Sequence, residues 1–178
     1  MSLLKNNREF CRKCLQKQSD VFENLCEGQK PIWFILACSD SRVSPTLITN
    51  SFLGDVFVHR NVSNIVDYND KSFTAALYYA LKHLQIEKLA VIGHSYCGGI
   101  SAAREGVLEK EMAEWLDNIS IDTAEVNPSH WKLEKKNVVT QVKRLKKHPV
   151  FIKYNRNQTV EGYLFHLDSG KLELLIEL

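Results

Sequence analysis

Three short apolar runs, separated by amphipathic segments, constrain the fold of this chain more than any other feature. The runs are IWFILA at 32–37, DVFVHR at 55–60 and LAVIG at 89–93, and each has the length and composition of a β-strand. Strands that alternate with helices form a mostly parallel sheet, because parallel neighbours need a crossover connection. The sequence therefore predicts an α/β fold with a mostly parallel central β-sheet flanked by helices.

The other segments extend this prediction. Helices are expected at 3–26, 98–105, 109–119, 136–147 and, with Ser72 as N-cap, from 72 to about 83. A fourth strand is expected at 150–154, where VFIKY follows Pro149. The tail alternates around a turn at 168–170, which predicts a hairpin and an antiparallel edge strand.

Length and composition favour one ordinary globular domain over residues 1–178. The chain is 44% hydrophobic and 25% charged, and its net charge of +2 is too small to indicate nucleic-acid binding. No segment reaches the roughly 18 apolar residues of a membrane span, and the first residues lack a secretory apolar run. We expect a cytoplasmic protein without a nucleic-acid or membrane partner.

Polar clusters follow two of the predicted strands. Cys38, Asp40 and Arg42 follow the first run at a spacing of two residues, and His94 and Cys97 follow the run at 89–93. Because the carboxyl ends of parallel strands share one rim of a sheet, the two clusters are expected to meet. Two thiolates and one imidazole suit Zn²⁺, and three protein ligands leave an open position, as in catalytic zinc sites.

Each feature also has an ordinary structural interpretation. A cysteine after a strand is often a small core residue, and an Asp–Arg pair is often a surface ion pair of little consequence. Cys11 and Cys14 form a Cys-x-x-Cys motif, but no strand precedes it and no second pair completes a metal site. We assign no chemistry to that motif or to Cys26.

The segments ACSDSRV, GDVFVHRNVSN and VIGHSYCGG, in this order and spacing, resemble the β-class carbonic anhydrases of the plant-like branch. The resemblance spans most of the chain. It implies that Cys38, His94 and Cys97 hold Zn²⁺, and that Asp40 and Arg42 form a dyad that orients the fourth ligand. The implied activity is that of a lyase: reversible hydration of carbon dioxide to bicarbonate and a proton, by attack of zinc-bound hydroxide.

The dyad has a physical rationale. Two thiolates cancel the formal charge of Zn²⁺, so its water should be harder to ionise than water on a tris-histidine zinc. Asp40, kept ionised by a bidentate pair with Arg42, can accept a hydrogen bond from that water. Without Arg42 the carboxylate could move onto the metal and close the site.

The resemblance also implies a substrate cleft. Gln29, Phe57 and Tyr79 match cleft positions of the plant-like branch, and Gly98 is placed with them. Without the resemblance, Gln29 fits a surface turn, and Phe57 and Tyr79 fit core packing equally well. His59 and Tyr79 are candidates for proton transfer to buffer.

Family members with an inhibitory bicarbonate pocket carry Trp three residues before the first zinc cysteine. Ile35 stands there in this chain, although Arg60 is retained. We therefore expect the form that is always open, with water as the fourth ligand.

The resemblance further implies a homo-oligomer, with a dimer as the minimum. Residues 1–28 correspond to an N-terminal helical arm that wraps a neighbouring subunit in related proteins. Its predicted apolar face needs a partner surface. That face includes Leu4, Phe10, Cys14, Val21 and Leu25.

Three rival functions remain. Enzymes that hydrolyse carbon disulfide or carbonyl sulfide use the same zinc motif, and tunnel shape separates them from carbonic anhydrases. A serine hydrolase using Ser95 is a distant alternative, because GHSYC differs by one residue from the G-x-S-x-G elbow, with Cys97 in place of the last glycine. An inactive zinc-binding protein is disfavoured by the intact Asp40 and Arg42.

Overall fold

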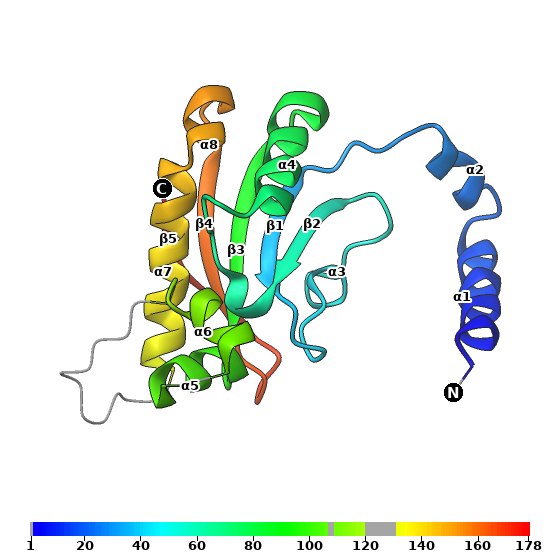
Figure 1. The fold of residues 1–178 in the computed structure, drawn as a ribbon. Helices are drawn as coiled ribbons and strands as arrows, with labels where there is room; N and C mark the ends of the chain where they lie inside the picture. The colour runs from blue at the N-terminus through cyan, green and yellow to red at the C-terminus, as the bar shows by residue number, and fades with distance from the viewer. Residues whose placement is uncertain (1, 107–108, 120–130) are drawn as a thin grey trace. The chain divides into compact units, whose positions relative to one another are not determined.

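A five-stranded β-sheet forms the centre of the unit Pro31–Leu178 in the computed structural model (Figure 1). The strands are β1 (Trp33–Cys38), β2 (Val56–Asn61), β3 (Lys88–His94), β4 (Thr159–Phe165) and β5 (Leu172–Glu177). Their order is β2-β1-β3-β4-β5, with β1 parallel to β2 and β3, β3 parallel to β4, and β5 antiparallel to β4. The predicted α/β fold with an antiparallel edge strand is confirmed.

Helices connect and flank these strands. The structure describes residues 2–106, 109–119 and 131–178. The helices of this unit are α3 (Pro45–Ile48), α4 (Lys71–Tyr79), α5 (Gly98–Glu105), α6 (Lys110–Leu116), α7 (Lys132–Lys147) and α8 (Pro149–Tyr154), with the 3-10 turn η1 (Val62–Asn64) and the π-helical turn η2 (Ala80–Leu84). The predicted helix at 98–105 is α5.

The core lies on both faces of the sheet. Phe34 and Leu36 of β1 pack on one face with buried side chains of α4, α7 and α8, whereas Ile35 and Ala37 pack on the other. Alternate residues of a strand point to opposite faces, so a strand buried on both must be apolar throughout. Burying each Leu or Phe side chain contributes roughly 1.5–3 kcal/mol. The continuous apolar run 32–37 therefore marks a central strand.

The predicted strand at 150–154 is wrong, because these residues form helix α8. Pro149 occupies the first turn, where its fixed φ suits a helix, and the His148 ring accepts a hydrogen bond from the Val150 N–H. Only Phe151 of this stretch is fully buried, and Ile152 is 64% exposed. One buried residue per turn is a helical pattern, which a short apolar run does not reveal.

Two predicted helix starts also need correction. Asp70 rather than Ser72 caps α4, since Asp70 Oδ1 accepts hydrogen bonds from two N–H groups of the first turn. Helix α7 begins at Lys132, four residues before the predicted start.

The N-terminal residues Met1–Lys30 form a unit of their own, with helices α1 (Leu3–Lys17) and α2 (Val21–Cys26). The single helix predicted over 3–26 is interrupted at Gln18, whose backbone is extended. Within the predicted apolar face Cys14 and Val21 are buried, whereas Leu4 is 71% exposed. Among the described residues no helix is long and apolar enough to cross a membrane.

Candidate metal centre

Cys38, His94 and Cys97 lie together at the carboxyl rim of the sheet. Cys38 ends β1, His94 ends the adjacent parallel strand β3, and Cys97 is the N-cap residue of α5. All three are buried, and their ligand atoms lie within 4.8 Å of one another. The prediction that the two sequence clusters meet is therefore correct in geometry. Parallel pairing of β1 with β3 brings residues 56 positions apart in the chain to one point.

The His94 ring has one nitrogen bonded and one free. Its Nδ1 donates to the backbone carbonyl of Ser95 at 2.9 Å, so Nε2 is the nitrogen that is left to bind a metal when the ring is neutral. Nε2 is buried and has no hydrogen-bond partner among the described residues. An unsatisfied buried polar atom is costly, and a metal ion would satisfy it.

This donor set fits a tetrahedral metal ion. Bonds of about 2.3 Å to sulfur and about 2.0 Å to nitrogen separate the ligand atoms of such an ion by roughly 3.5–4 Å. The three atoms here lie close enough to adopt that spacing. Cys11 and Cys14 of α1 are free cysteines that are not part of the metal cluster found among the described residues.

The sulfur atoms of Cys38 and Cys97 shift each other's pKa in opposite directions. A hydrogen bond from the Cys38 thiol lowers the pKa of Cys97 to about 4, and the same contact raises the pKa of Cys38. Burial, the largest single influence, lowers the pKa of His94, but the Cys97 sulfur, the Ser95 backbone and the Asp40 charge together raise it above its ordinary value. The lowered pKa favours the thiolate form of Cys97, and a metal ion would favour loss of the thiol proton from both cysteines.

Asp40 and Arg42 form a bidentate pair beside the cluster. Asp40 Oδ1 accepts from Arg42 Nε at 2.9 Å and from the Arg42 backbone N–H at 2.9 Å, and Oδ2 accepts from Nη2 at 2.7 Å. These hydrogen bonds hold the pKa of Asp40 far below its usual range. Asp40 Oδ2 also lies 3.8 Å from His94 Nε2. An ionised carboxylate therefore stands next to the free nitrogen.

Backbone carbonyls at the end of β1 and in the segment after it accept hydrogen bonds from a single guanidinium, that of Arg60. Arg60 donates to the carbonyls of Cys38 at 3.0 Å, Asp40 at 2.8 Å and Val43 at 2.6 Å. Arg42 also reaches the Tyr96 carbonyl, 3.2 Å away, which ties this segment to the one between His94 and Cys97. No sequence pattern indicates this structural role of Arg60, because carbonyl partners leave no trace in residue identity.

The predicted cleft residues are only partly brought together. The Phe57 and Tyr79 rings are 5.8 Å apart between centroids, and Tyr79 is 44% exposed. Phe57 pairs with Phe34, four residues before Cys38, which is roughly 13 Å along the strand. Within one chain this aromatic pair is therefore separated from the metal cluster.

The other two predicted cleft residues differ in position. Gly98 begins α5 directly after Cys97, and apart from its chain neighbours and the backbone of its own helix, no described heavy atom lies within 4 Å of the place a Cβ would take. Gln29 is exposed and belongs to the N-terminal unit. Its place in a cleft stays a prediction.

Ser95 does not resemble an exposed nucleophile. It is fully buried, and its Oγ accepts a hydrogen bond from the Leu167 N–H at 2.9 Å. The nucleophile of a G-x-S-x-G elbow instead projects its hydroxyl at an exposed turn. The geometry therefore gives no support to a serine hydrolase.

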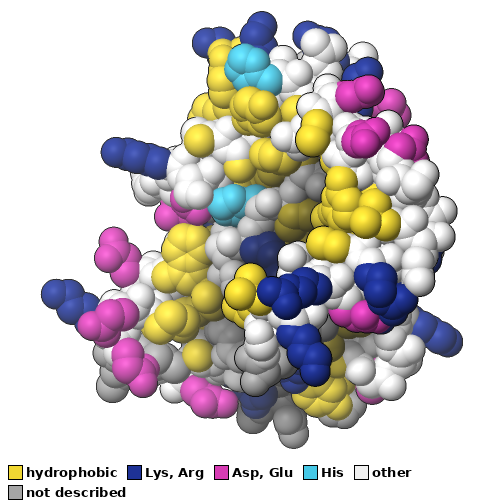
Figure 2. All heavy atoms as spheres, turned by 90° about the vertical axis from the view of Figure 1, so that its right-hand side faces the viewer, with side chains coloured by type: hydrophobic (Ala, Val, Ile, Leu, Met, Phe, Trp, Pro, Cys, Tyr) yellow, Lys and Arg dark blue, Asp and Glu magenta, His cyan; other side chains and the backbone are white. Residues whose placement is uncertain are grey.

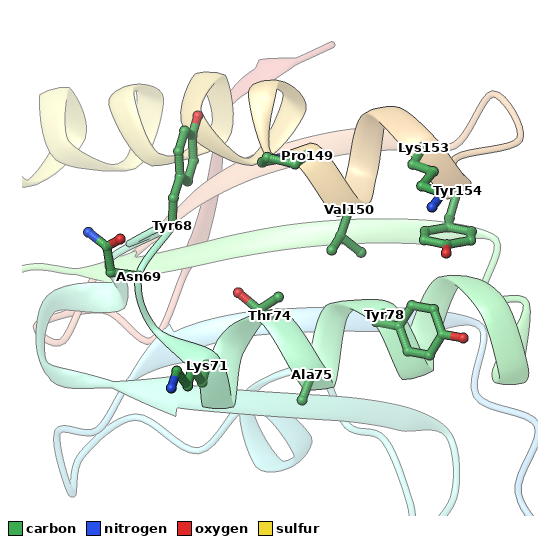
Figure 3. Close-up of a pocket in the computed structure, with 10 residues that line it drawn as sticks. All are labelled: Tyr68, Asn69, Lys71, Thr74, Ala75, Tyr78, Pro149, Val150, Lys153 and Tyr154. Atoms are coloured by element: carbon green, nitrogen blue, oxygen red, sulfur yellow. The ribbon is translucent and has the colours of Figure 1, made fainter.

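A groove of about 660 Å³ lies elsewhere, between α4 and α8 (Figure 3). In Figure 3, Tyr78 and Tyr154 lie at one end of this groove and Tyr68 lies toward the other. Its lining includes none of the predicted site residues. The groove is therefore a feature separate from the metal centre.

Comparison with known proteins identifies relatives over nearly the whole chain. A family model described as carbonic anhydrase matches residues 33–172. A carbonic anhydrase of Synechocystis sp. is 31% identical over 188 residues, covering 96% of this chain and 69% of the relative.

Solved structures of β-carbonic anhydrases are similar to this chain over nearly its whole length. Structures titled as tetrameric β-carbonic anhydrases from Sordaria macrospora superpose with a TM-score of 0.91 at 29% identity, covering 98% of this chain and 96% of theirs. A Coccomyxa β-carbonic anhydrase in complex with acetazolamide also gives a TM-score of 0.91, at 27% identity, covering 99% of this chain and 86% of that one. All residues of the candidate metal centre lie within the matched region. From its sequence motifs, its fold and these relatives, the chain belongs to the β-class carbonic anhydrases.

Proposed function

We propose that this chain catalyses the reversible hydration of carbon dioxide to bicarbonate and a proton, with Zn²⁺ held by Cys38, His94 and Cys97. The observation that carries the proposal is the buried three-ligand cluster with a free His94 Nε2, next to an ionised Asp40. Relatives named carbonic anhydrase support the reaction.

Zinc is the metal that this donor set favours. Thiolate and imidazole ligands suit Zn²⁺, whereas Mg²⁺ and Ca²⁺ prefer oxygen donors. When bound, Zn²⁺ would supply a Lewis acid that lowers the pKa of a coordinated water. Three protein ligands are available, which is the number found in catalytic zinc sites.

Asp40 has the geometry of an orienting group. Its carboxylate can accept a hydrogen bond from the attacking water and so direct an oxygen lone pair at the carbon of the substrate. Arg42 donates to both carboxylate oxygens, which keeps Asp40 anionic and opposes its movement into the metal site. This arrangement supports the predicted open form, in which water is the fourth ligand.

We also propose that the substrate cleft is completed by another copy of the chain. Phe57 lies roughly 13 Å from Cys38 along the sheet and Tyr79 packs on Phe57, so one chain alone does not bring this pair to the metal. Figure 2 shows hydrophobic side chains on the surface among charges of both signs. Exposed hydrophobic residues between β1 and β2 include Leu47, Phe52 and Leu53. Together with the tetrameric relatives, these features support a homo-oligomer, at least a dimer.

One purified sample can test the reaction. We expect about one zinc per chain, carbon dioxide hydration that is lost on chelation and returns with added Zn²⁺, and inhibition by acetazolamide. Carbon disulfide and carbonyl sulfide should be assayed beside carbon dioxide. Zinc-loaded protein that turns over only the sulfur compounds would replace the proposed substrate, and protein that binds no zinc would refute the proposal.

A further inference from the structure

The loop formed by Asn61 and the turn η1 touches both sulfur atoms of the candidate metal centre. The Ser63 backbone N–H donates to Cys38 Sγ at 3.4 Å, and Ser63 Oγ lies 3.6 Å from Cys97 Sγ. Ser63 is fully buried. Once both sulfurs are metal-bound thiolates they can only accept, so the hydroxyl must donate to Cys97.

This contact depends on an unfavourable backbone conformation. Ser63 has φ +64° and Asn64 has φ +49°, both in the left-handed region. For residues other than glycine that region costs roughly 1–2 kcal/mol each. Such a loop persists only where surrounding contacts compensate for the cost.

The Asn61 side chain, near in sequence, and the Trp115 side chain, distant in sequence, supply part of that compensation. Asn61 accepts from the Ile65 N–H and donates to the Ile65 carbonyl, both at 2.8 Å. Trp115 of α6 donates to the Val62 carbonyl at 3.0 Å. The loop is therefore held at both ends.

Two buried amides of α7 supply the rest. Asn137 Nδ2 donates to the Ser63 carbonyl at 2.9 Å, and Gln141 Nε2 donates to Asn137 Oδ1 at 2.9 Å. Gln141 Oε1 in turn accepts from the Val66 N–H at 2.9 Å. Both side chains are buried on a 16-residue helix packed on the sheet. A rigid helix thus fixes the loop from a distance of more than 70 residues in the chain.

Gly99 leaves room for the serine hydroxyl. A Cβ built on Gly99 would lie 2.1 Å from Ser63 Oγ, a distance that real atoms do not tolerate. Position 99 therefore requires a glycine, because a side chain there would overlap the Ser63 hydroxyl.

We propose that Ser63 is a positioning residue that hydrogen-bonds both ligand sulfurs, and that Asn137 and Gln141 of α7 hold it in place. The inference rests on the proposed metal site and adds to it. A thiolate that accepts a hydrogen bond donates less charge to its metal, so Ser63 partly offsets the effect of two anionic ligands.

The test compares Ser63→Gly with Ser63→Ala. Both remove the hydroxyl, but glycine also relieves the left-handed backbone, so Ser63→Gly should fold well. Zinc affinity is measured by competition with a chromophoric chelator, and we expect about tenfold weaker binding in both variants. In the Co²⁺-substituted protein, the sulfur-to-metal charge-transfer band should move to longer wavelength, because the sulfur loses a hydrogen bond.

The two amides of α7 provide a second test of the inference, and a buried amide away from the loop provides the control. Asn137→Ala and Gln141→Ala should weaken zinc binding in the same direction as the serine variants. Gln158→Ala removes a buried amide that donates to the Ile86 carbonyl at 3.0 Å, away from the loop, and should leave zinc affinity and the cobalt band unchanged.

The outcomes separate the two proposals. Wild-type protein that binds no zinc refutes the metal site and with it the inference. If the wild type binds zinc and Ser63→Gly changes neither the zinc affinity nor the cobalt spectrum, the inference about Ser63 is refuted and the metal site is not. If Ser63→Ala weakens zinc binding but Ser63→Gly binds zinc as tightly as the wild type, backbone strain and not the loss of the hydroxyl is responsible. That result also refutes the inference about Ser63.

Discussion

The metal cluster and the Phe57–Tyr79 pair are both predicted site features, yet they are constructed differently. The cluster is buried and held by backbone and side-chain hydrogen bonds from several segments. The aromatic pair is partly exposed and held by ring contacts. The comparison indicates that one chain brings together all three candidate metal ligands but does not bring the aromatic pair to them.

The largest effect is expected from removal of a metal ligand. Cys97→Ala should lose zinc and reduce carbon dioxide hydration to the uncatalysed rate, because two remaining ligands cannot hold the ion. Zinc content and initial rates measure this. The control variant Cys26→Ala changes an exposed cysteine outside the cluster, and it should retain both the zinc and the carbon dioxide hydration. Full zinc occupancy in Cys97→Ala would mean that the metal lies elsewhere.

Asp40→Asn should keep zinc but reduce kcat by about 100-fold or more, because an amide is a poor proton acceptor. Zinc content and kcat on one preparation measure the two effects separately. A fully active Asp40→Asn variant would remove Asp40 from the mechanism.

Variants of the aromatic pair should have a smaller effect that tests the role of a second copy. Tyr79→Ala should lower kcat/KM by about tenfold without loss of zinc, by the loss of roughly 1.4 kcal/mol of substrate positioning. Tyr78→Ala, whose ring faces the groove of Figure 3, is the matched control and should leave kcat/KM unchanged.

Light scattering of the same preparations completes this test. We expect a dimer or larger assembly for the wild type. A stable monomer with full activity would show that no second copy is needed, and the proposal that another copy completes the cleft would fail.

The smallest effect concerns pH. Arg42 lowers the pKa of Asp40, so their pair stabilises the fold fully above the ordinary Asp pKa of about 3.9 and loses that contribution as pH falls through the folded-state value. The difference in free energy of unfolding between wild type and Arg42→Ala should be constant from pH 5 to 8 and shrink below about pH 4. Denaturant unfolding at several pH values measures it. A difference that grows toward low pH would contradict the assigned cause.

Part of the fold and site could be predicted because local pattern and topology agree. Continuous apolar runs indicate strands buried on both faces, and the ends of parallel strands share one rim, which places Cys38 near His94. The same reasoning failed at 150–154, where a five-residue apolar run fits either a strand or a helix. The contacts of Asn137 and Gln141 were missed because polar residues on a helix usually face water.

The sequence by itself determined the strand–helix alternation, the two Cys and one His available for metal, and the Asp40–Arg42 pair, because each depends on residue type at short spacing. Only the tertiary structure decided that His94 Nε2 is free, that Ser63 lies on both sulfurs, and that the aromatic pair is remote from them. These features depend on contacts between segments that are distant in the chain, and such contacts exist only once packing against the sheet has set the backbone.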